Sequence, residues 1–177
     1  MRAMKRFLAA AALVFALFGA VALWGMTLPA VQQVERSAVI DADIERVFAA
    51  IDDLPAFAAW SPHIPDGADV QFGERAGEGA SLAYGTADGR SVGSAEIVQS
   101  APPELVLIAL VNRDDTAMLT YALAREGGRT LVVAREERSL DGVLARVSAR
   151  TRRGAAEERV DAGLARLDAA IAADPEG

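Results

Sequence analysis

The feature of this sequence that most restricts its fold is a change in the spacing of its apolar residues. From residue 68 to residue 138, apolar and polar residues alternate in short runs, which is typical of strands with one buried face. From residue 140 to residue 173, the spacing becomes that of a helix rich in Ala, Leu, Arg and Glu. A sheet with an apolar face must be covered, and this helix is the only long element available. The pattern therefore predicts an α+β fold.

About seven strands are expected, because an alternating stretch at residues 32–42 precedes six others. Short turns that contain Gly, Asp, Asn or Pro separate the six, which are 68–74, 79–86, 91–100, 105–112, 116–125 and 129–138. Short connections join antiparallel neighbours, so the strands should form one curved antiparallel sheet around the C-terminal helix. Two short helices, at 43–51 and 54–60, should close one end and leave a groove or cavity between the sheet and the long helix.

The C-terminal helical region carries two apolar stripes that do not line up. The first consists of Leu140, Val143, Leu144 and Val147, and the second of Val160, Leu164, Leu167 and Ile171. At about 100° per residue, Val147 and Val160 would lie roughly 140° apart on a straight helix. We therefore expect either a break near Gly154 or two halves that bury different faces.

The N-terminal part contains 22 consecutive uncharged residues, from 7 to 28. As a helix this stretch would be about 33 Å long, close to the ~30 Å thickness of a bilayer's hydrocarbon core. Three basic residues precede it, and positive charge stays on the cytoplasmic side. The stretch therefore predicts a single-pass membrane anchor with the rest of the chain on the non-cytoplasmic side, periplasmic or extracellular. A cleaved signal peptide is the alternative, because residues 20–22 fit the small-x-small cleavage pattern.

This division predicts two parts, residues 1–29 as the anchor or signal segment and residues 30–177 as the working domain. The domain carries 15 arginines against 25 acids, a formal charge of −10, which argues against nucleic acid as a partner. The absence of cysteine excludes disulfides and thiolate metal sites. His63, the only histidine, is expected on a surface loop without a catalytic role. We predict no metal site, no cofactor and no catalytic residues, since nucleotide-binding and serine-hydrolase motifs do not occur.

Four segments, in this order, resemble the START-like superfamily, also called SRPBCC, and its polyketide cyclase/dehydrase-type members. They are RSAVIDADIERVFAAIDDLPAFAAWSP at 36–62, IVQSAPPELV at 97–106, YALAREGGRTLVV at 121–133 and GLARLDAAI at 163–171. The resemblance covers about residues 34–173. It implies a helix-grip fold that encloses a pocket for apolar ligands such as lipids, sterols or polyketides. It implies no fixed catalytic residue.

Aromatic residues with a polar tip suit a mostly apolar pocket that contains a few orienting hydrogen bonds. The candidates for lining such a pocket are Trp60, Leu82, Tyr84, Leu119, Tyr121 and Leu123. Residues 119, 121 and 123 alternate on one strand and share a face, as do residues 82 and 84 on another. Plain core packing is the alternative interpretation of all six.

The leading functional hypothesis is a non-enzymatic domain, held at the membrane by residues 7–28, that binds a small hydrophobic molecule or lipid. One alternative is a polyketide cyclase/dehydrase-type enzyme, in which pocket tyrosines and an interior carboxylate such as Glu136 act on an aromatic or polyketide substrate. Another is an interaction module with a filled core and no ligand cavity. Arginines at 146, 150, 152 and 153 form either a solvated helix face paired with nearby acids or a contact for anionic lipid headgroups.

Overall fold

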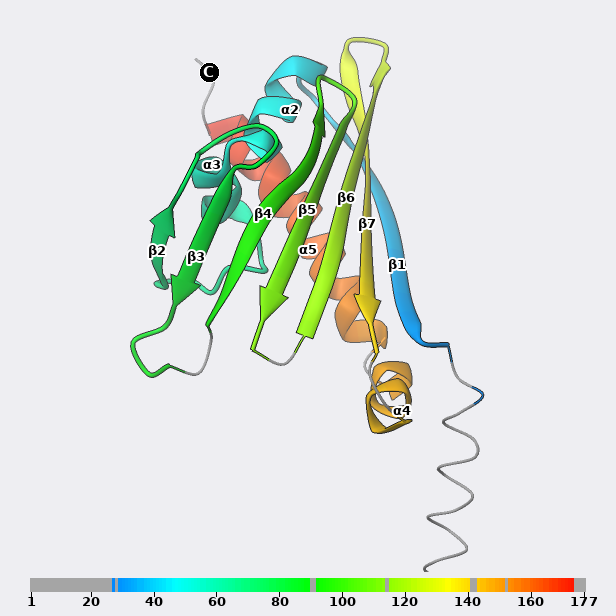
Figure 1. The fold of residues 1–177 in the computed structure, drawn as a ribbon. Coiled ribbons are helices and arrows are strands. Elements are labelled where there is room, and N and C mark those ends of the chain that lie inside the picture. Colours follow the sequence, from blue (N-terminus) through cyan, green and yellow to red (C-terminus); the bar gives the residue numbers. More distant parts are fainter. Residues whose placement is uncertain are drawn as a thin grey trace, which may run out of the picture.

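A computed structural model describes residues 27, 29–89, 92–113, 115–140, 143–151 and 153–173. The strands are β1 (Val31–Ile40), β2 (Asp69–Phe72), β3 (Ser81–Gly85), β4 (Val92–Ala101), β5 (Leu105–Asn112), β6 (Asp115–Glu126) and β7 (Arg129–Ser139) (Figure 1). The helices are α2 (Ile44–Asp52), α3 (Leu54–Trp60), α4 (Val143–Thr151) and α5 (Arg153–Ala173). Apart from Thr27, the expected N-terminal span at 7–28 lies outside these residues. None of the helices within the described ranges is long and apolar enough to cross a bilayer.

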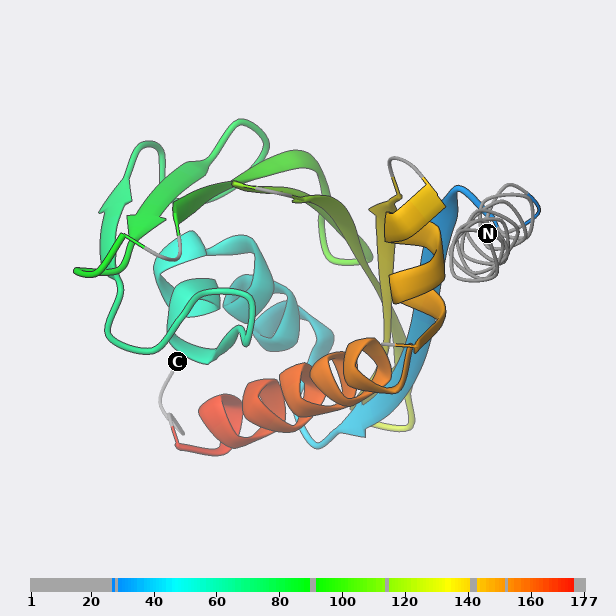
Figure 2. The same ribbon diagram turned by 90° about the horizontal axis from the view of Figure 1, so that it is seen from below.

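The seven strands form one sheet in the order β1-β7-β6-β5-β4-β3-β2, and all neighbours are antiparallel. The first strand pairs with the last along its whole length, from Val31 opposite Ser139 to Ile40 opposite Thr130. The remaining strands follow one another as a meander, so β1 and β2 are the two edges. Figure 2 shows that the sheet is strongly curved. The prediction of an α+β fold with a curved antiparallel sheet and a long C-terminal helix is confirmed.

Local sequence explains the two short helices between β1 and β2. The apolar face expected for the first is buried in α2, where Val47 and Ile51 are fully inaccessible to solvent. Asp53 begins α3 as its N-cap, since its carboxylate accepts a hydrogen bond from the backbone N–H of Ala56 at 3.3 Å. The pair of aspartates at 52 and 53 thus separates two helices that pack against each other.

The concave side of the sheet holds α2, α3 and α5 together, whereas the long helix was expected to cover it alone (Figure 2). The buried core extends from Val34 to Ile171 and includes Phe57 and Trp60 of α3. Because α2 also contacts β5, β6 and β7, the two short helices fill much of the space between the sheet and α5. They do more than close one end of the fold.

The C-terminal helical region is divided into α4 and α5 between Thr151 and Arg153. Of the two alternatives, the break is therefore observed, and Gly154 lies just inside α5. The second apolar stripe is confirmed, because Val160, Leu164, Leu167 and Ile171 of α5 are all buried. Instead of continuing α5, α4 lies at the end of the sheet where β1 begins (Figure 1). Of the first apolar stripe, Leu140 and Val147 are partly buried, and the side chains of residues 143 and 144 lie outside those described.

Candidate functional site

The loop after α3 directs the only histidine of the chain into the protein. Ser61 ends α3, and its hydroxyl oxygen accepts a hydrogen bond from the backbone N–H of His63 at 3.3 Å. The loop lies close to α5 at Gly163, where an added Cβ would be 3.4 Å from Cδ of Pro62. The side chain of His63 is only 7% exposed. The expectation that His63 lies on a surface loop is therefore wrong, because the loop packs against α5.

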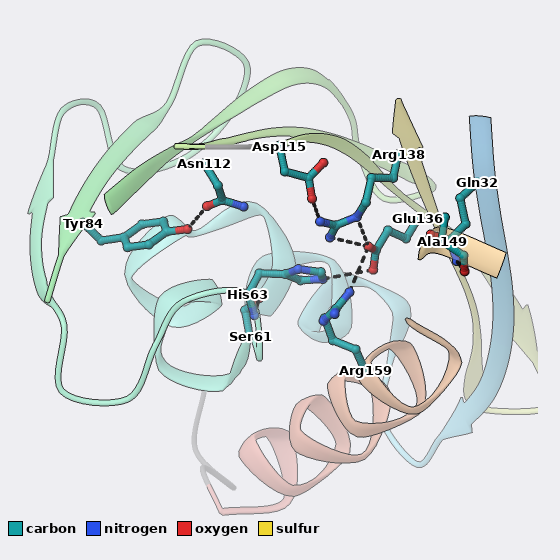
Figure 3. Close-up of polar contacts among 10 residues, drawn as sticks. All are labelled: Gln32, Ser61, His63, Tyr84, Asn112, Asp115, Glu136, Arg138, Ala149 and Arg159. Carbon is teal, nitrogen blue, oxygen red and sulfur yellow. Dashed lines mark hydrogen bonds and ion pairs between the residues drawn. The ribbon is translucent and has the colours of Figure 1, made fainter. Parts of the chain in front are cut away.

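The last strand places two charged side chains opposite His63, on the concave face. Oε1 of Glu136 accepts hydrogen bonds from Nε and Nη2 of Arg138, at 3.0 and 2.6 Å, and from Nη1 of Arg159, at 3.2 Å. Asp115 forms an ion pair with Arg138 from the other side. The second oxygen, Oε2 of Glu136, is buried without a hydrogen-bond partner and lies 3.7 Å from Nε2 of His63. Figure 3 shows these five residues, here called the polar wall, reaching from the sheet to α5.

Burial sets the protonation states of the polar wall. It raises the pKa of Glu136, an effect that the positive charge of Arg159 and its hydrogen bond oppose. Burial, together with the smaller effect of the positive charges of Arg159 and Arg138, lowers the pKa of His63 to about 3. His63 is therefore neutral at pH 7, and its contact with Glu136 is not an ion pair there. When Glu136 is ionised, the positive charges of Arg138 and Arg159 are balanced by the negative charges of Glu136 and Asp115.

Two of the six predicted pocket residues meet in an aromatic cluster behind this wall. The ring of Trp60 lies edge-to-face with those of Phe57 and Tyr121, with centroids 5.1 and 6.0 Å away. The indole N–H of Trp60 donates to the carbonyl of Ala50 at 2.9 Å, so its polar atom is used within the core. Burial and the nearby Glu136 carboxylate raise the pKa of the Tyr121 hydroxyl, which stays protonated at neutral pH.

The other four predicted residues are also buried but lie in different surroundings. Leu119 is next to Tyr121 and Glu136 beside a small cavity. Tyr84 of β3 donates a hydrogen bond to Oδ1 of Asn112 (Figure 3). Leu82 and Leu123 are core residues, 2% and 5% exposed. Whether any of the six contacts a ligand stays a prediction.

Two spaces of very different size lie on the two sides of the polar wall. The inner cavity measures about 10 Å³, which is room for about one water molecule. It lies between the concave face and α5, and its lining includes His63, Leu119, Tyr121, Glu136, Arg159 and Leu164. The outer groove is open and measures about 720 Å³. Most of its lining residues are polar or charged, and the full lining is Gln32, Asn112, Arg113, Asp115, Thr116, Arg138, Ser139, Leu140, Ala145, Ser148, Ala149, Ala155, Ala156 and Arg159.

Arg159 borders both spaces, so the polar wall separates the outer groove from the interior. Exposure of the side chains falls across the wall, from 34% at Arg159 through 19% at Arg138 to 3% at Glu136. A molecule in the outer groove would therefore meet the two guanidinium groups first. The carboxylate behind them becomes accessible only if the arginines move.

In the part of the chain that the structure describes, no group of three or more His, Asp or Glu side chains is arranged to hold a metal ion. From the sequence, Glu136 was expected only as an interior carboxylate, and its contacts with the other residues of the polar wall were not expected. A signal did exist, because alternation along β7 continues from Val132 through Ala134 to residues 136 and 138 on the same face. The partners Asp115 and Arg159 come from β6 and α5, and no local pattern indicates them.

Comparison with known proteins connects this geometry to a family. The model of the family described as "Polyketide cyclase / dehydrase and lipid transport" matches residues 31–172. The chain belongs to this family. The match covers all seven strands and nearly all of α5, which confirms the resemblance to START-like proteins that the sequence showed. No curated protein is significantly similar to the chain.

Solved structures of low sequence identity share the fold. A crystal structure from Thermus thermophilus has a TM-score of 0.61 at 18% identity, with 80% of this chain and 98% of that chain covered. A protein from Rhodobacter sphaeroides has a TM-score of 0.59 at 16% identity, with coverages of 81% and 98%. DynU16, a protein of the dynemicin biosynthetic locus, has a TM-score of 0.54 at 14% identity, with coverages of 77% and 45%. Such identities show a common fold only.

Proposed function

We propose that this family member binds a small, largely apolar molecule in the outer groove, with an oxygen atom of the molecule directed at the polar wall. The observation that carries the proposal is the outer groove itself, about 720 Å³ in volume and ending on Arg138 and Arg159. Drug-sized and lipid-like ligands occupy clefts of roughly 300–1,000 Å³ that are mostly apolar with a few polar groups. The groove is of this size but more polar than such clefts usually are. Leu140 and alanine side chains provide its apolar part, and the guanidinium groups of Arg138 and Arg159 are among its polar groups.

The unused N–H donors of the polar wall indicate which chemical group of the ligand would contact it. A guanidinium group has five N–H donors, and the hydrogen bonds described for Arg159 use only Nη1, on Glu136. Carbonyl, hydroxyl or carboxylate oxygens would accept from the remaining donors. We therefore propose an apolar molecule with an oxygen acceptor at one end, such as a fatty acid or a polyketide carbonyl compound.

Fluorescence titration with an apolar probe that carries a carboxylate tests this proposal. Ala145→Trp fills the outer groove, whereas Ala165→Trp adds the same side chain to an exposed position of α5. We expect Ala145→Trp to abolish probe binding and Ala165→Trp to leave it unchanged. If neither the natural protein nor the Ala165→Trp variant binds any apolar probe, an interaction module with a filled core becomes the better account.

A second part of the proposal concerns location. We infer that residues 7–28 anchor the chain as a single span and that residues 30–177 form the binding domain on the non-cytoplasmic side, as the charge pattern of the first residues indicates. Alkaline extraction of membranes containing the full chain tests the anchor. Retention in the membrane supports it, and release into the wash contradicts it. N-terminal sequencing of the mature protein distinguishes the anchor from a cleaved signal peptide.

An enzymatic role is supported by one observation, the shared position of Tyr121 and Glu136 beside the inner cavity. A protonated tyrosine is a proton donor, and the unpartnered Oε2 of Glu136 is a proton acceptor, which together suit acid–base chemistry on a carbonyl compound. The cavity holds about one water, so a substrate would have to displace the polar wall. Turnover of an aromatic polyketide precursor that is lost in both Tyr121→Phe and Glu136→Gln would establish this role.

A further inference from the structure

A second cluster of arginines lies outside the outer groove, at the end of the domain where the chain enters β1. A surface pocket of about 270 Å³, here called the basic pocket, is located between β1 and α4. It is lined by Pro29, Val31, Gln32, Gln33, Leu140, Arg146, Ala149, Arg150 and Arg153. Three of these residues are arginines and none is acidic. This is unusual in a domain with a formal charge of −10.

The arginines of the basic pocket are poorly neutralised by the protein. Arg146 and Arg150 are four residues apart on α4, so they lie on one helix face. Within the described parts of the chain, neither is within ion-pair distance of a carboxylate, and Nε of Arg146 is buried without a hydrogen-bond partner. Arg153 is paired, at 3.1 Å, with Glu157. Two guanidinium groups are thus available to a ligand.

The position of the pocket is held by contacts between β1 and α4. The side-chain amide of Gln32 donates to the carbonyl of Ala149 at 3.4 Å, as Figure 3 shows. The backbone N–H of Leu140 donates to the carbonyl of Ala30 at 2.8 Å. The pocket therefore lies next to Pro29, the residue that follows the proposed membrane span.

We infer that the basic pocket binds the phosphate group of an anionic membrane lipid, with Arg146 and Arg150 as its donors. The inference rests on the proposed anchor, because a span that ends at residue 28 would hold Pro29 and the adjoining pocket at the level of the lipid headgroups. Planar guanidinium groups match the oxygens of a phosphate, and two such groups on one helix face can share one headgroup. The basic pocket adjoins the outer groove and shares Gln32, Leu140 and Ala149 with it, but its two donors, Arg146 and Arg150, do not line the groove.

Vesicle binding by residues 29–177, which include every residue that lines the pocket, tests the inference without the proposed membrane span. This part can be studied alone, because its core lies between Val34 and Ile171 and the family match spans residues 31–172. The net negative charge of the domain opposes binding to anionic vesicles, so any such binding must be local. We expect binding to phosphatidylcholine vesicles that contain phosphatidylglycerol, no binding to phosphatidylcholine alone, and weakening by salt.

Substitution of the two arginines identifies the donors. Each basic side chain near an anionic surface contributes a factor of about five in partitioning, so Arg146→Gln with Arg150→Gln should lower it about 25-fold. Arg166→Gln, on the exposed side of α5 far along the helix, is the matched control for one lost charge and should have no effect. Urea unfolding midpoints equal to that of the unchanged domain show that the variants are folded.

Three outcomes would overturn the inference. The first is equal vesicle binding by the double variant and the unchanged domain, and the second is an equal loss in Arg166→Gln. The third is calorimetric binding of inorganic phosphate in the absence of vesicles, lost in the double variant, which would assign the pocket to a free phosphate compound instead of a lipid. None of these outcomes involves extraction of the full chain, so failure of this inference and failure of the anchor are distinguishable.

Discussion

The buried histidine makes folding stability depend on pH in a way that one substitution isolates. His63 has a pKa of about 3 in the folded protein and about 6.5 when unfolded. Because its folded pKa is the lower one, the unfolded chain takes up the proton first as the pH falls. The contribution of His63 is therefore fully favourable above about pH 7 and is lost progressively between about pH 6.5 and pH 3.

The size of the effect at pH 5 depends almost entirely on the unfolded state. There the unfolded histidine is nearly all protonated and the folded one is nearly all neutral, which costs about 2 kcal/mol of stability relative to pH 8. Any folded pKa below about 4 leads to the same figure. The raised pKa of Glu136 acts in the opposite direction, since its protonation favours the folded state as the pH falls. That effect is present with and without His63.

Urea unfolding of residues 30–177 and of its His63→Gln variant, each at pH 8 and pH 5, measures the difference. His63 is the only histidine, so no other imidazole contributes. We expect the unchanged domain to lose about 2 kcal/mol more than the variant between the two pH values. Equal losses, or an NMR titration of the folded imidazole with a midpoint near 6.5, would refute the buried, neutral assignment.

Three further substitutions test the packing that surrounds the site, each by urea unfolding. Gly93→Ala places a Cβ 2.5 Å from Oδ1 of Asn112 and 2.6 Å from the Tyr84 hydroxyl, so it should break their hydrogen bond and cost about 1–3 kcal/mol; an unchanged midpoint would contradict this contact. Thr130→Val removes the 2.7 Å hydrogen bond to the carbonyl of Ala42 and should cost about 1–3 kcal/mol, whereas a neutral result would mean that water reaches the carbonyl. Leu167→Ala, at a fully buried position of α5, should cost about 2–5 kcal/mol, and less than 1 kcal/mol would argue that α5 does not pack on the sheet.

The polar wall suggests how a START-like fold can be closed inside and still present a ligand site. Phe57, Trp60 and Tyr121 fill the space between the sheet and α5, and the charged groups lie between this core and the outer groove. Each guanidinium group retains a carboxylate partner, so the wall is stable without a ligand. A ligand oxygen would add hydrogen bonds at the exposed edge of Arg159 without requiring the core to open.

The fold was predictable because each strand and helix has one buried face, and the spacing of buried residues reports the element type. The seven strands and the buried stripe of α5 were expected on this basis, and the division of the C-terminal helical region was one of two alternatives. The alternation in β7 also places Glu136 on the concave face. Its pairing with Arg159 was not predictable, because it depends on how α5 crosses the sheet, which no local pattern encodes.

The size of the cavity inside the fold could not be predicted from the sequence either. A groove or cavity between the sheet and the long helix was expected, but its volume depends on how the side chains of α3 pack there. The position of His63 shows the same limit, since a loop residue becomes buried only where Pro62 meets Gly163 of α5. Contacts between elements distant in sequence decide both features.

Native mass spectrometry of the full chain, purified in mild detergent from the cells that produce it, tests ligand binding in the outer groove most directly. We predict a complex with a non-covalent small molecule of apolar character, present in the natural protein and in Ala165→Trp and absent in Ala145→Trp. A protein that carries no small molecule and takes up none of an added set of fatty acids and aromatic polyketides would contradict the account. Equal retention in both tryptophan variants would do so as well, because the ligand would then lie outside the groove.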